Sequence, residues 1–260
     1  MEQYPEMFER TALLIGKAGL DKLQNARVAV IGLGGVGSYT VEALARAGVG
    51  YLRVVDNDQY VPSNLNRQLH ALADTIGMLK TEAVRERVQR INPAIKIDPR
   101  AEFVTATNLS SIITRDLDYV VDAIDTVSSK IWLIRYCLEQ KIRIVSCMGT
   151  GNRLDPSGFC FSDISRTHTC PLARAVRGGL RKIGIDHGVE VLFSTVPPLP
   201  PRGGQEQRAG TENPGKSRQA PGSISFVPSI AGLLLAGLVV NRLLATTGPE
   251  SGMLRPDPWS

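Results

Sequence analysis

The stretch RVAVIGLGGVGS at residues 27–38 decides the fold of this chain. An apolar run typical of a buried strand leads into a glycine-rich turn, and Ser38 then opens a helix that extends to Ala47. Backbone N–H groups and the positive end of the helix dipole meet in such a turn, where a phosphate group can approach closely because glycine has no side chain. The pattern therefore predicts a nucleotide-binding βαβ unit, with a tight helix–sheet turn as the alternative. The glycines concerned are Gly32, Gly34, Gly35 and Gly37.

Strand-like and helix-like segments go on alternating after this turn. We expect strands within YLRVVDND (51–58), IKIDPRAEF (95–103), DYVVDAID (118–125) and IRIVSCMG (142–149), and helices over 76–91 and 127–140. This alternation predicts an α/β fold: a Rossmann-like, doubly wound, mostly parallel sheet with helices on both faces. In such sheets ligands bind at the carboxyl ends of the strands.

The length of 260 residues suits a single domain, whose parts differ in composition. They are an N-terminal helical arm (1–26), a nucleotide-binding core (27–150), a substrate-side region (151–246) and a tail (247–260). Within the substrate-side region a basic helix begins near Pro171. A stretch at 197–222, rich in Pro, Gly, Gln, Arg and Lys, predicts a mobile loop.

Composition narrows the class of protein and its partners. The net charge of +5 favours an anionic partner such as a nucleotide or RNA. The four cysteines form no C-x-x-C pair, so we expect no zinc. The N-terminal residues MEQYPEMFER include acids and lack the apolar core of a secretory signal, which favours a cytoplasmic location.

One apolar segment, over 224–245, raises the question of a membrane. Pro228 interrupts the uncharged stretch and Arg242 follows it, so its uninterrupted apolar part is shorter than the roughly 20 residues that cross a bilayer. We therefore expect a buried core helix or a dimer-interface helix rather than integral membrane insertion. Peripheral membrane contact is the remaining alternative.

Charged residues after the second strand distinguish ATP from NAD as the nucleotide. Asp56 follows that strand, where a carboxylate can bind ribose hydroxyls in either case. Arg67 and Lys80 add cations near the phosphates, which suits a reaction in which pyrophosphate leaves, whereas a dehydrogenase has no such leaving group. Asp125, at the end of DYVVDAID, is the natural ligand for Mg²⁺. Solvated surface charges and a helix cap are the alternatives.

Several motifs occur together in one order: GLGGVGS at 32–38, VVDND, SNLNRQ, Lys80 and DAIDT. In this they resemble the ubiquitin-activating-like adenylyltransferase superfamily, and the resemblance covers most of the chain. It implies that residues 1–260 form a single ATP-binding, adenylyltransferase-like domain. The sequence does not decide whether the protein also binds a monovalent cation.

The resemblance also implies roles for individual residues. Asp56, with Asp58 beside it, would lie at the ribose, and Asp125 would hold the metal. Arg10, in FERTALLIG, matches the arginine that reaches across a homodimer to the γ-phosphate, so a homodimer is implied. Asn64, Arg67 and Lys80 would lie at the phosphates, and Gln68 is also implied in nucleotide binding. The residues implied in catalysis are Arg10, Arg67, Lys80 and Asp125.

Further stretches, NRQLHAL, CMGTGNRLDP, SDISRTHTCPLAR and GSISFVPSIAGL, resemble the tRNA threonylcarbamoyladenosine dehydratases. That family implies ATP-dependent adenylation of the threonylcarbamoyl carboxylate on the tRNA adenosine next to the anticodon, followed by cyclisation with loss of water. The carbamoyl nitrogen attacks within the same molecule, so no thioester cysteine is needed. The alternatives are an adenylyltransferase for the C-terminus of a ubiquitin-like sulfur-carrier protein, a non-catalytic nucleotide-binding scaffold for a cysteine-desulfurase-type partner, and a nicotinamide-dependent dehydrogenase.

The basic helix is the candidate surface for tRNA. Arg174, Arg177 and Arg181 are three or four residues apart, so one helix face can meet backbone phosphates, and Arg166 lies nearby in the sequence. An ordinary solvated helix face is the alternative. Cys170, directly before this helix, is either a reactive thiol or a structural cysteine, and we favour the structural role.

Overall fold

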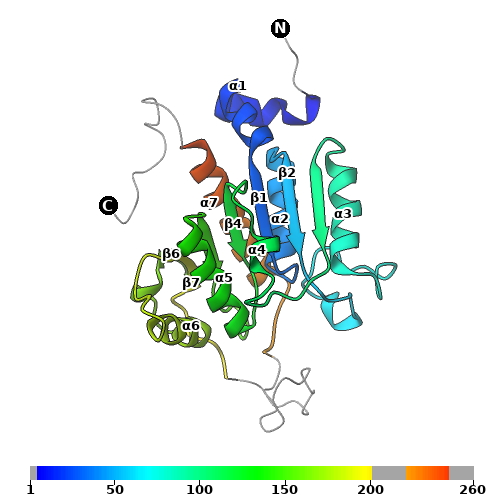
Figure 1. The fold of residues 1–260 in the computed structure, drawn as a ribbon. Helices are drawn as coiled ribbons and strands as arrows, with labels where there is room; N and C mark the ends of the chain where they lie inside the picture. The colour runs from blue at the N-terminus through cyan, green and yellow to red at the C-terminus, as the bar shows by residue number, and fades with distance from the viewer. Residues whose placement is uncertain (1–4, 201–220, 246–260) are drawn as a thin grey trace.

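The computed structural model describes residues 5–200 and 221–245, which contain a seven-stranded sheet (Figure 1). Its strands are β1 (Arg27–Ile31), β2 (Tyr51–Val55), β3 (Lys96–Arg100), β4 (Tyr119–Asp122), β5 (Ile144–Cys147), β6 (Phe159–Asp163) and β7 (Glu190–Ser194). The strand order is β3-β2-β1-β4-β5-β7-β6, and only the β6–β7 pair is antiparallel. A mostly parallel sheet in which the chain changes direction between β1 and β4 is doubly wound, so the predicted fold class is confirmed.

Helices cover both faces of the sheet. The helices are α1 (Glu9–Asn25), α2 (Gly37–Ala47), α3 (Lys80–Ile91), α4 (Leu109–Ile112), α5 (Val127–Gln140), α6 (Pro171–Arg181) and α7 (Phe226–Leu244), with short 3-10 turns η1 (Glu6–Phe8), η2 (Pro62–Asn64) and η3 (Ile164–Arg166). One core lies between the sheet and α2, α3 and α7, and the other lies between the sheet and α4, α5 and α6.

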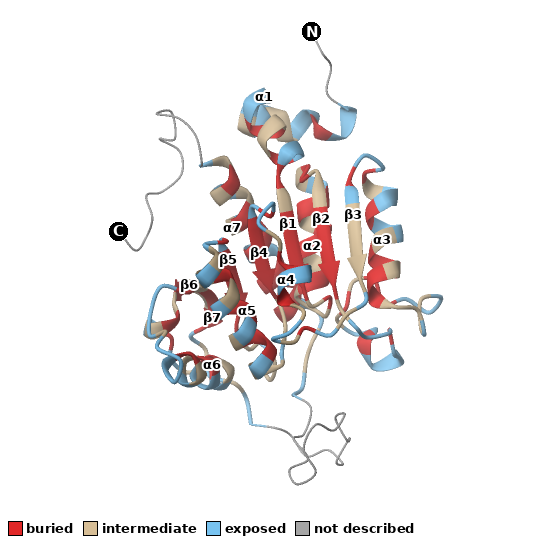
Figure 2. Ribbon diagram, viewed as in Figure 1, coloured by how far each residue is buried: buried red, intermediate tan, exposed pale blue. Residues whose placement is uncertain are grey.

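The central strands are buried on both faces (Figure 2). Successive side chains of a strand point to opposite faces, so Val28 and Val30 of β1 enter the first core while Ala29 and Ile31 enter the second. This explains why these strands read as continuous apolar runs in the sequence. The glycine turn follows β1 directly, at the edge where the parallel strands end.

The helix expected over 76–91 begins four residues later, at Lys80. Gly77 has a left-handed φ of 88°, which ends any helix there, and its N–H donates to the carbonyl of Tyr60. Tyr60 in turn donates its N–H to the carbonyl of Met78. The residues before Lys80 are therefore paired with the segment after β2 and cannot belong to a helix.

The apolar segment after residue 221 forms α7, which runs through Pro228. The expectation that Pro228 interrupts this stretch was wrong, because the proline lies in the first helical turn, where its missing N–H costs nothing. Among the described residues, α7 is the one helix long and apolar enough to cross a bilayer, and half of its most apolar window is buried. A core helix of a globular protein has the same properties.

The predicted mobile loop at 197–222 and the tail at 247–260 lie mostly or wholly outside the described residues. The described residues at the two ends of that loop meet at Asn152, which has a left-handed φ of 56°. Its carbonyl accepts from Leu199 N–H at 2.7 Å, and its side chain accepts from Gly222 N–H at 2.6 Å. The loop therefore starts and ends beside the carboxyl end of β5. The division of the domain into arm, core, substrate-side region and tail stays a prediction.

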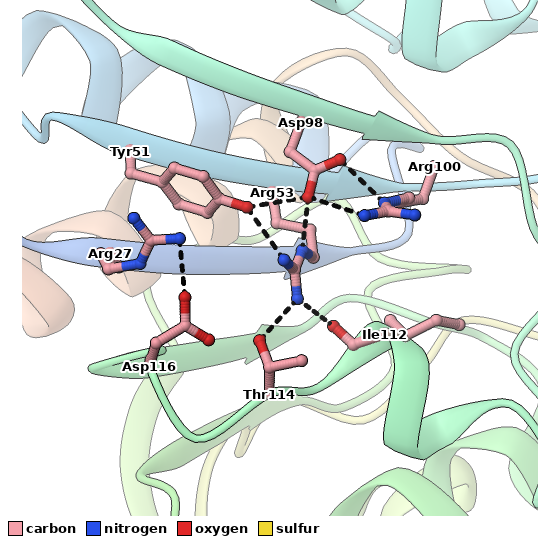
Figure 3. Close-up of polar contacts among 8 residues, drawn as sticks. All are labelled: Arg27, Tyr51, Arg53, Asp98, Arg100, Ile112, Thr114 and Asp116. Carbon is pink, nitrogen blue, oxygen red and sulfur yellow. Dashed lines mark hydrogen bonds and ion pairs between the residues drawn. The ribbon is translucent and has the colours of Figure 1, made fainter.

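A polar cluster fills the face of β2 and β3 that is turned toward α4 (Figure 3). Arg53, 6% exposed, donates to the Asp98 carboxylate and to the Ile112 carbonyl, both at 2.8 Å, and so ties the sheet to the α4 segment. Burial raises the pKa of the Asp98 carboxyl, but hydrogen bonds from Tyr51, Arg100 and Arg53 outweigh this and lower the pKa below its usual value.

Candidate functional site

The glycines of the turn fall into two kinds. Some pack closely against backbone atoms, and others border open space. A Cβ on Gly37 would lie 1.8 Å from the Gly32 carbonyl oxygen, and one on Gly32 would lie 2.7 Å from the Ala123 carbonyl oxygen. These two glycines are therefore required by the fold itself. A Cβ on Gly34 would meet only Gln68 Nε2, at 3.9 Å. The open space at Gly34 is what a phosphate-binding turn needs.

Asp56 lies at the carboxyl end of β2 and faces the glycine turn. One of its carboxylate oxygens accepts from Leu33 N–H at 2.7 Å, and the other accepts from Asp58 N–H at 2.9 Å. Burial raises the pKa of this carboxyl, opposed chiefly by the charge of Lys80. Lys80 is 5% exposed, and its Nζ lies 2.8 Å from Asp58 Oδ2 and 3.6 Å from Asp56 Oδ1. The structure thus brings Asp56, Asp58 and Lys80 together beside the turn.

The segment from Val61 to Gln68 brings two further predicted residues to the turn. The Arg67 side chain passes over Gly35, where an added Cβ would lie 3.4 Å from Arg67 Cγ. Gln68 is 7% exposed, and its Oε1 is buried without a hydrogen-bond partner among the described residues. Asn64 is also buried, but its Oδ1 accepts from Val61 N–H at 3.1 Å and so holds the segment's own turn.

Asp125 lies on the short turn between β4 and α5, on the same edge of the sheet, and is exposed. The described residues contain no group of three or more His, Cys, Asp or Glu side chains that could hold a metal by themselves. Mg²⁺ rarely needs such a cage, because it is usually bound by one or two carboxylates together with substrate phosphates and water. A single exposed aspartate beside a phosphate-binding turn therefore fits Mg²⁺.

Arg10 lies far from the glycine turn of its own chain. It is an exposed residue in the first turn of α1, and α1 ends directly before the amino end of β1, whereas the glycine turn follows the carboxyl end (Figure 1). Helix α1 changes direction at Gly16, whose φ is 64°. Arg10 therefore does not contribute to the nucleotide site of its own chain.

The basic helix α6 begins at the same edge of the sheet as the glycine turn. An added Cβ on Gly149, after β5, would lie 3.4 Å from Cys170 Sγ, and Cys170 itself is 3% exposed. Arg174 and Arg181 are exposed on α6, and Arg166 is exposed just before it. Arg177 is only partly exposed, and its guanidinium donates to the carbonyl oxygen (2.8 Å) and hydroxyl of Thr167. Arg177 is thus committed to fixing the segment before the helix.

The sequence reasoning missed a buried ion pair at the end of β4. Lys130 of α5 and Asp122 of β4 are both fully buried, with Lys130 Nζ 2.8 Å from Asp122 Oδ2. One signal was available: Lys130 shares a helical face with Leu133, Ile134 and Cys137, all of which are apolar and buried. A lysine on an apolar helix face must find a partner, and that partner could not be named before the fold was known.

A glycine turn, a carboxylate at its side, two cations and an exposed aspartate on one edge of a doubly wound sheet define a nucleotide-binding α/β protein. The model of the ThiF family matches residues 8–260. The tRNA threonylcarbamoyladenosine dehydratase of Bacillus subtilis (strain 168) is 44% identical over 239 residues, which are 91% of this chain and 94% of that protein. The chain therefore belongs to the ThiF family and, within it, to the family of tRNA threonylcarbamoyladenosine dehydratases.

Solved structures agree with this assignment. The crystal structure of the Escherichia coli tRNA N6-threonylcarbamoyladenosine dehydratase in complex with ATP is similar, with a TM-score of 0.80 and 32% identity, and the match covers 95% of this chain and 99% of that one. The same enzyme in complex with AMP gives a TM-score of 0.82 and covers 94% of this chain and 96% of that one.

Proposed function

We propose that this protein uses ATP to adenylate the carboxylate of the threonylcarbamoyl group on the tRNA adenosine next to the anticodon, and then cyclises it. The observation that carries the proposal is the open space at Gly34 on the edge of the sheet that also carries Arg67, Lys80 and Asp125. The activity named for the Bacillus subtilis and Escherichia coli relatives supports the same substrate.

The chemistry has two steps. In the first, a carboxylate oxygen attacks the α-phosphorus of ATP, and pyrophosphate leaves. In the second, the carbamoyl nitrogen attacks the activated acyl carbon, loses its proton, and AMP leaves with the former carboxylate oxygen. The net change in the nucleoside is the loss of one water. Both reacting groups belong to one substrate, so the second step needs only correct orientation by the protein.

The residues at the sheet edge would act on the first step. Arg67 and Lys80 would stabilise the charge that develops on the departing pyrophosphate. Asp125 would hold Mg²⁺, which neutralises phosphate charge when it is bound. Asp56 would accept hydrogen bonds from ribose. Gln68 is available to the nucleotide, because its buried Oε1 has no hydrogen-bond partner within residues 5–200 and 221–245.

The direct test incubates the purified protein with ATP and tRNA that carries threonylcarbamoyladenosine, followed by mass spectrometry of the nucleosides. The expected product is the nucleoside lighter by one water, with AMP and pyrophosphate formed in equal amounts. ATP–pyrophosphate exchange with a ubiquitin-like sulfur-carrier protein, and none with the modified tRNA, would favour the sulfur-carrier alternative. Binding of ATP without turnover of either substrate would favour a nucleotide-binding scaffold.

A homodimer is part of the proposal, because Arg10 cannot reach its own nucleotide site. Exposed apolar side chains suit a contact between copies: Leu13 and Leu14 on α1 are 86% and 85% exposed, and Leu233 on α7 is 50% exposed. Mixing two inactive variants, Arg10→Ala and Lys80→Ala, tests this arrangement. After subunit exchange, activity should return to about a quarter of the wild-type value, because half of the dimers are mixed and each has one intact site. No recovery would refute the role of Arg10 across the dimer.

We further propose that tRNA contacts Arg166, Arg174 and Arg181 at the edge of the sheet where α6 begins. We also propose a cytoplasmic location and a cysteine-desulfurase-type partner. The location is tested by finding whether the protein is in the cytosol or the membrane fraction, and the partner is tested by copurification from that fraction. ATP binding in potassium, sodium and choline buffers tests the monovalent cation that the sequence left open.

A further inference from the structure

The buried ion pair of Lys130 and Asp122 belongs to a three-membered network. Ser146 of β5 donates its hydroxyl to Asp122 Oδ2 at 2.6 Å and lies 3.1 Å from Lys130 Nζ. The side chains of Lys130 and Asp122 are 0% exposed. The network thus joins β4, β5 and α5 at the point where both strands end.

The second oxygen of Asp122 shapes the turn that follows. Asp122 Oδ1 accepts from Ile124 N–H at 3.1 Å, and the neighbouring Ala123 N–H donates to the Ile31 carbonyl at 2.8 Å. The Ala123 carbonyl packs so closely on Gly32 that no side chain fits there. The turn is therefore fixed against the glycine turn on one side and to Asp122 on the other, and Asp125 is its next residue.

A purely stabilising role accounts poorly for this network. The free-energy cost of removing two charges from water is about as large as the free energy gained from their attraction. Apolar residues of similar volume often stabilise a core equally well. What an apolar pair cannot do is hold a carboxylate in one orientation and accept the Ile124 N–H.

We propose that Asp122, held in place by Lys130 and Ser146, is a positioning residue for Asp125. Its fixed carboxylate holds the Ile124 backbone and so directs Asp125 toward the phosphates, and without Lys130 the unpaired carboxylate would leave this orientation. This inference rests on the proposed function, in which Asp125 holds Mg²⁺.

The experiment measures ATP affinity by calorimetry in Mg²⁺ and in EDTA, together with AMP affinity. In the wild type, Mg²⁺ should tighten ATP binding, and in Lys130→Met about tenfold or more of that tightening should be lost, since groups that orient a metal ligand typically affect metal affinity by 10–100-fold. AMP affinity should stay within about twofold, because AMP lacks the β- and γ-phosphates that a metal bridges. Arg53→Met is the matched control, because it also removes a buried cation from a carboxylate (Figure 3). Arg53 lies on β2, two strands away from β4. It should lower the melting temperature and leave the Mg²⁺ effect unchanged.

Two double variants keep the test decisive if Lys130→Met does not fold. Lys130→Met with Asp122→Asn carries no buried charge and keeps an acceptor for Ile124, so the Mg²⁺ effect should remain. Lys130→Met with Asp122→Leu also carries no buried charge but lacks the acceptor, so the effect should be lost. A leucine variant that responds to Mg²⁺ as the wild type does overturns the inference alone. A wild-type protein that does not respond to Mg²⁺ overturns the proposed role of Asp125 as well.

Discussion

Replacing Gly34 with alanine should separate nucleotide binding from stability. The new methyl group would meet only Gln68 Nε2, at 3.9 Å, and Gly34 does not have a left-handed φ, so the folded protein accepts alanine without strain. Because alanine restricts the unfolded chain, stability should rise by about 0.4–1 kcal/mol. For a chain of this size that is an increase in melting temperature of roughly 1–4 °C.

ATP binding should weaken in the same variant, because the methyl group enters the space that we assign to phosphate. Displacing the phosphate from one backbone N–H removes a charge-assisted hydrogen bond of about 1.5–3 kcal/mol. The dissociation constant of ATP should then rise roughly 10- to 150-fold. Calorimetry and thermal unfolding on one preparation measure both effects.

Gly178→Ala on α6 is the matched control, since a Cβ at Gly178 has nothing within 4 Å and the variant should gain stability without change in ATP affinity. Gly34→Ala with wild-type ATP affinity would show that the phosphates bind elsewhere.

Four further variants probe the rest of the site and the fold. Asp125→Ala should abolish turnover in the tRNA assay while the melting temperature stays within about 2 °C of the wild type, because Asp125 is exposed; measurable turnover would remove it from the metal site. Asp98 has a lowered pKa, so its stabilising effect is present above its unfolded value of 3.8 and is lost as the pH falls below that value. The free energy of unfolding, measured by denaturant titration, should therefore fall less between about pH 5 and pH 3 in Asp98→Asn than in the wild type. This pH range is about the one in which the Asp98 carboxyl becomes protonated. Arg177→Ala should lower stability by about 1–3 kcal/mol by leaving Thr167 without its donor, and an unchanged unfolding midpoint would contradict this. Leu13→Asp should give monomers in light scattering, whereas persistent dimers would place the interface elsewhere.

The sequence predicted the parts of the fold that depend on local patterns. The apolar runs of β1, β4 and β5 and the glycine turn could be recognised because strand burial and the need for glycine are both visible in a short window. The helix over 127–140 was predicted with its exact bounds. The start of α3 was missed because it depends on the pairing of Gly77 and Met78 with Tyr60, which lie far apart in the sequence.

The sequence predicted those residues of the candidate site that belong to short motifs. Asp56, Asp58 and Lys80 come from such motifs, and the structure places them together, while their roles at a nucleotide stay a prediction. The contact of Arg177 with Thr167 could not be foreseen, because helical spacing reveals which face a residue lies on and not what that face meets. The network of Lys130 likewise depends on the neighbourhood of β4 and β5, which only the strand order supplies.

Strand β3 forms one border of the sheet, and its sequence, KIDPR, makes that border a poor template for a further strand. Pro99 has no N–H to offer an incoming chain, and Lys96 and Arg100 place charge along the same border. Copies of the chain are thereby discouraged from joining into continuous sheets across this border. A second copy that extended the sheet would have to pair with the other border, at β6, instead.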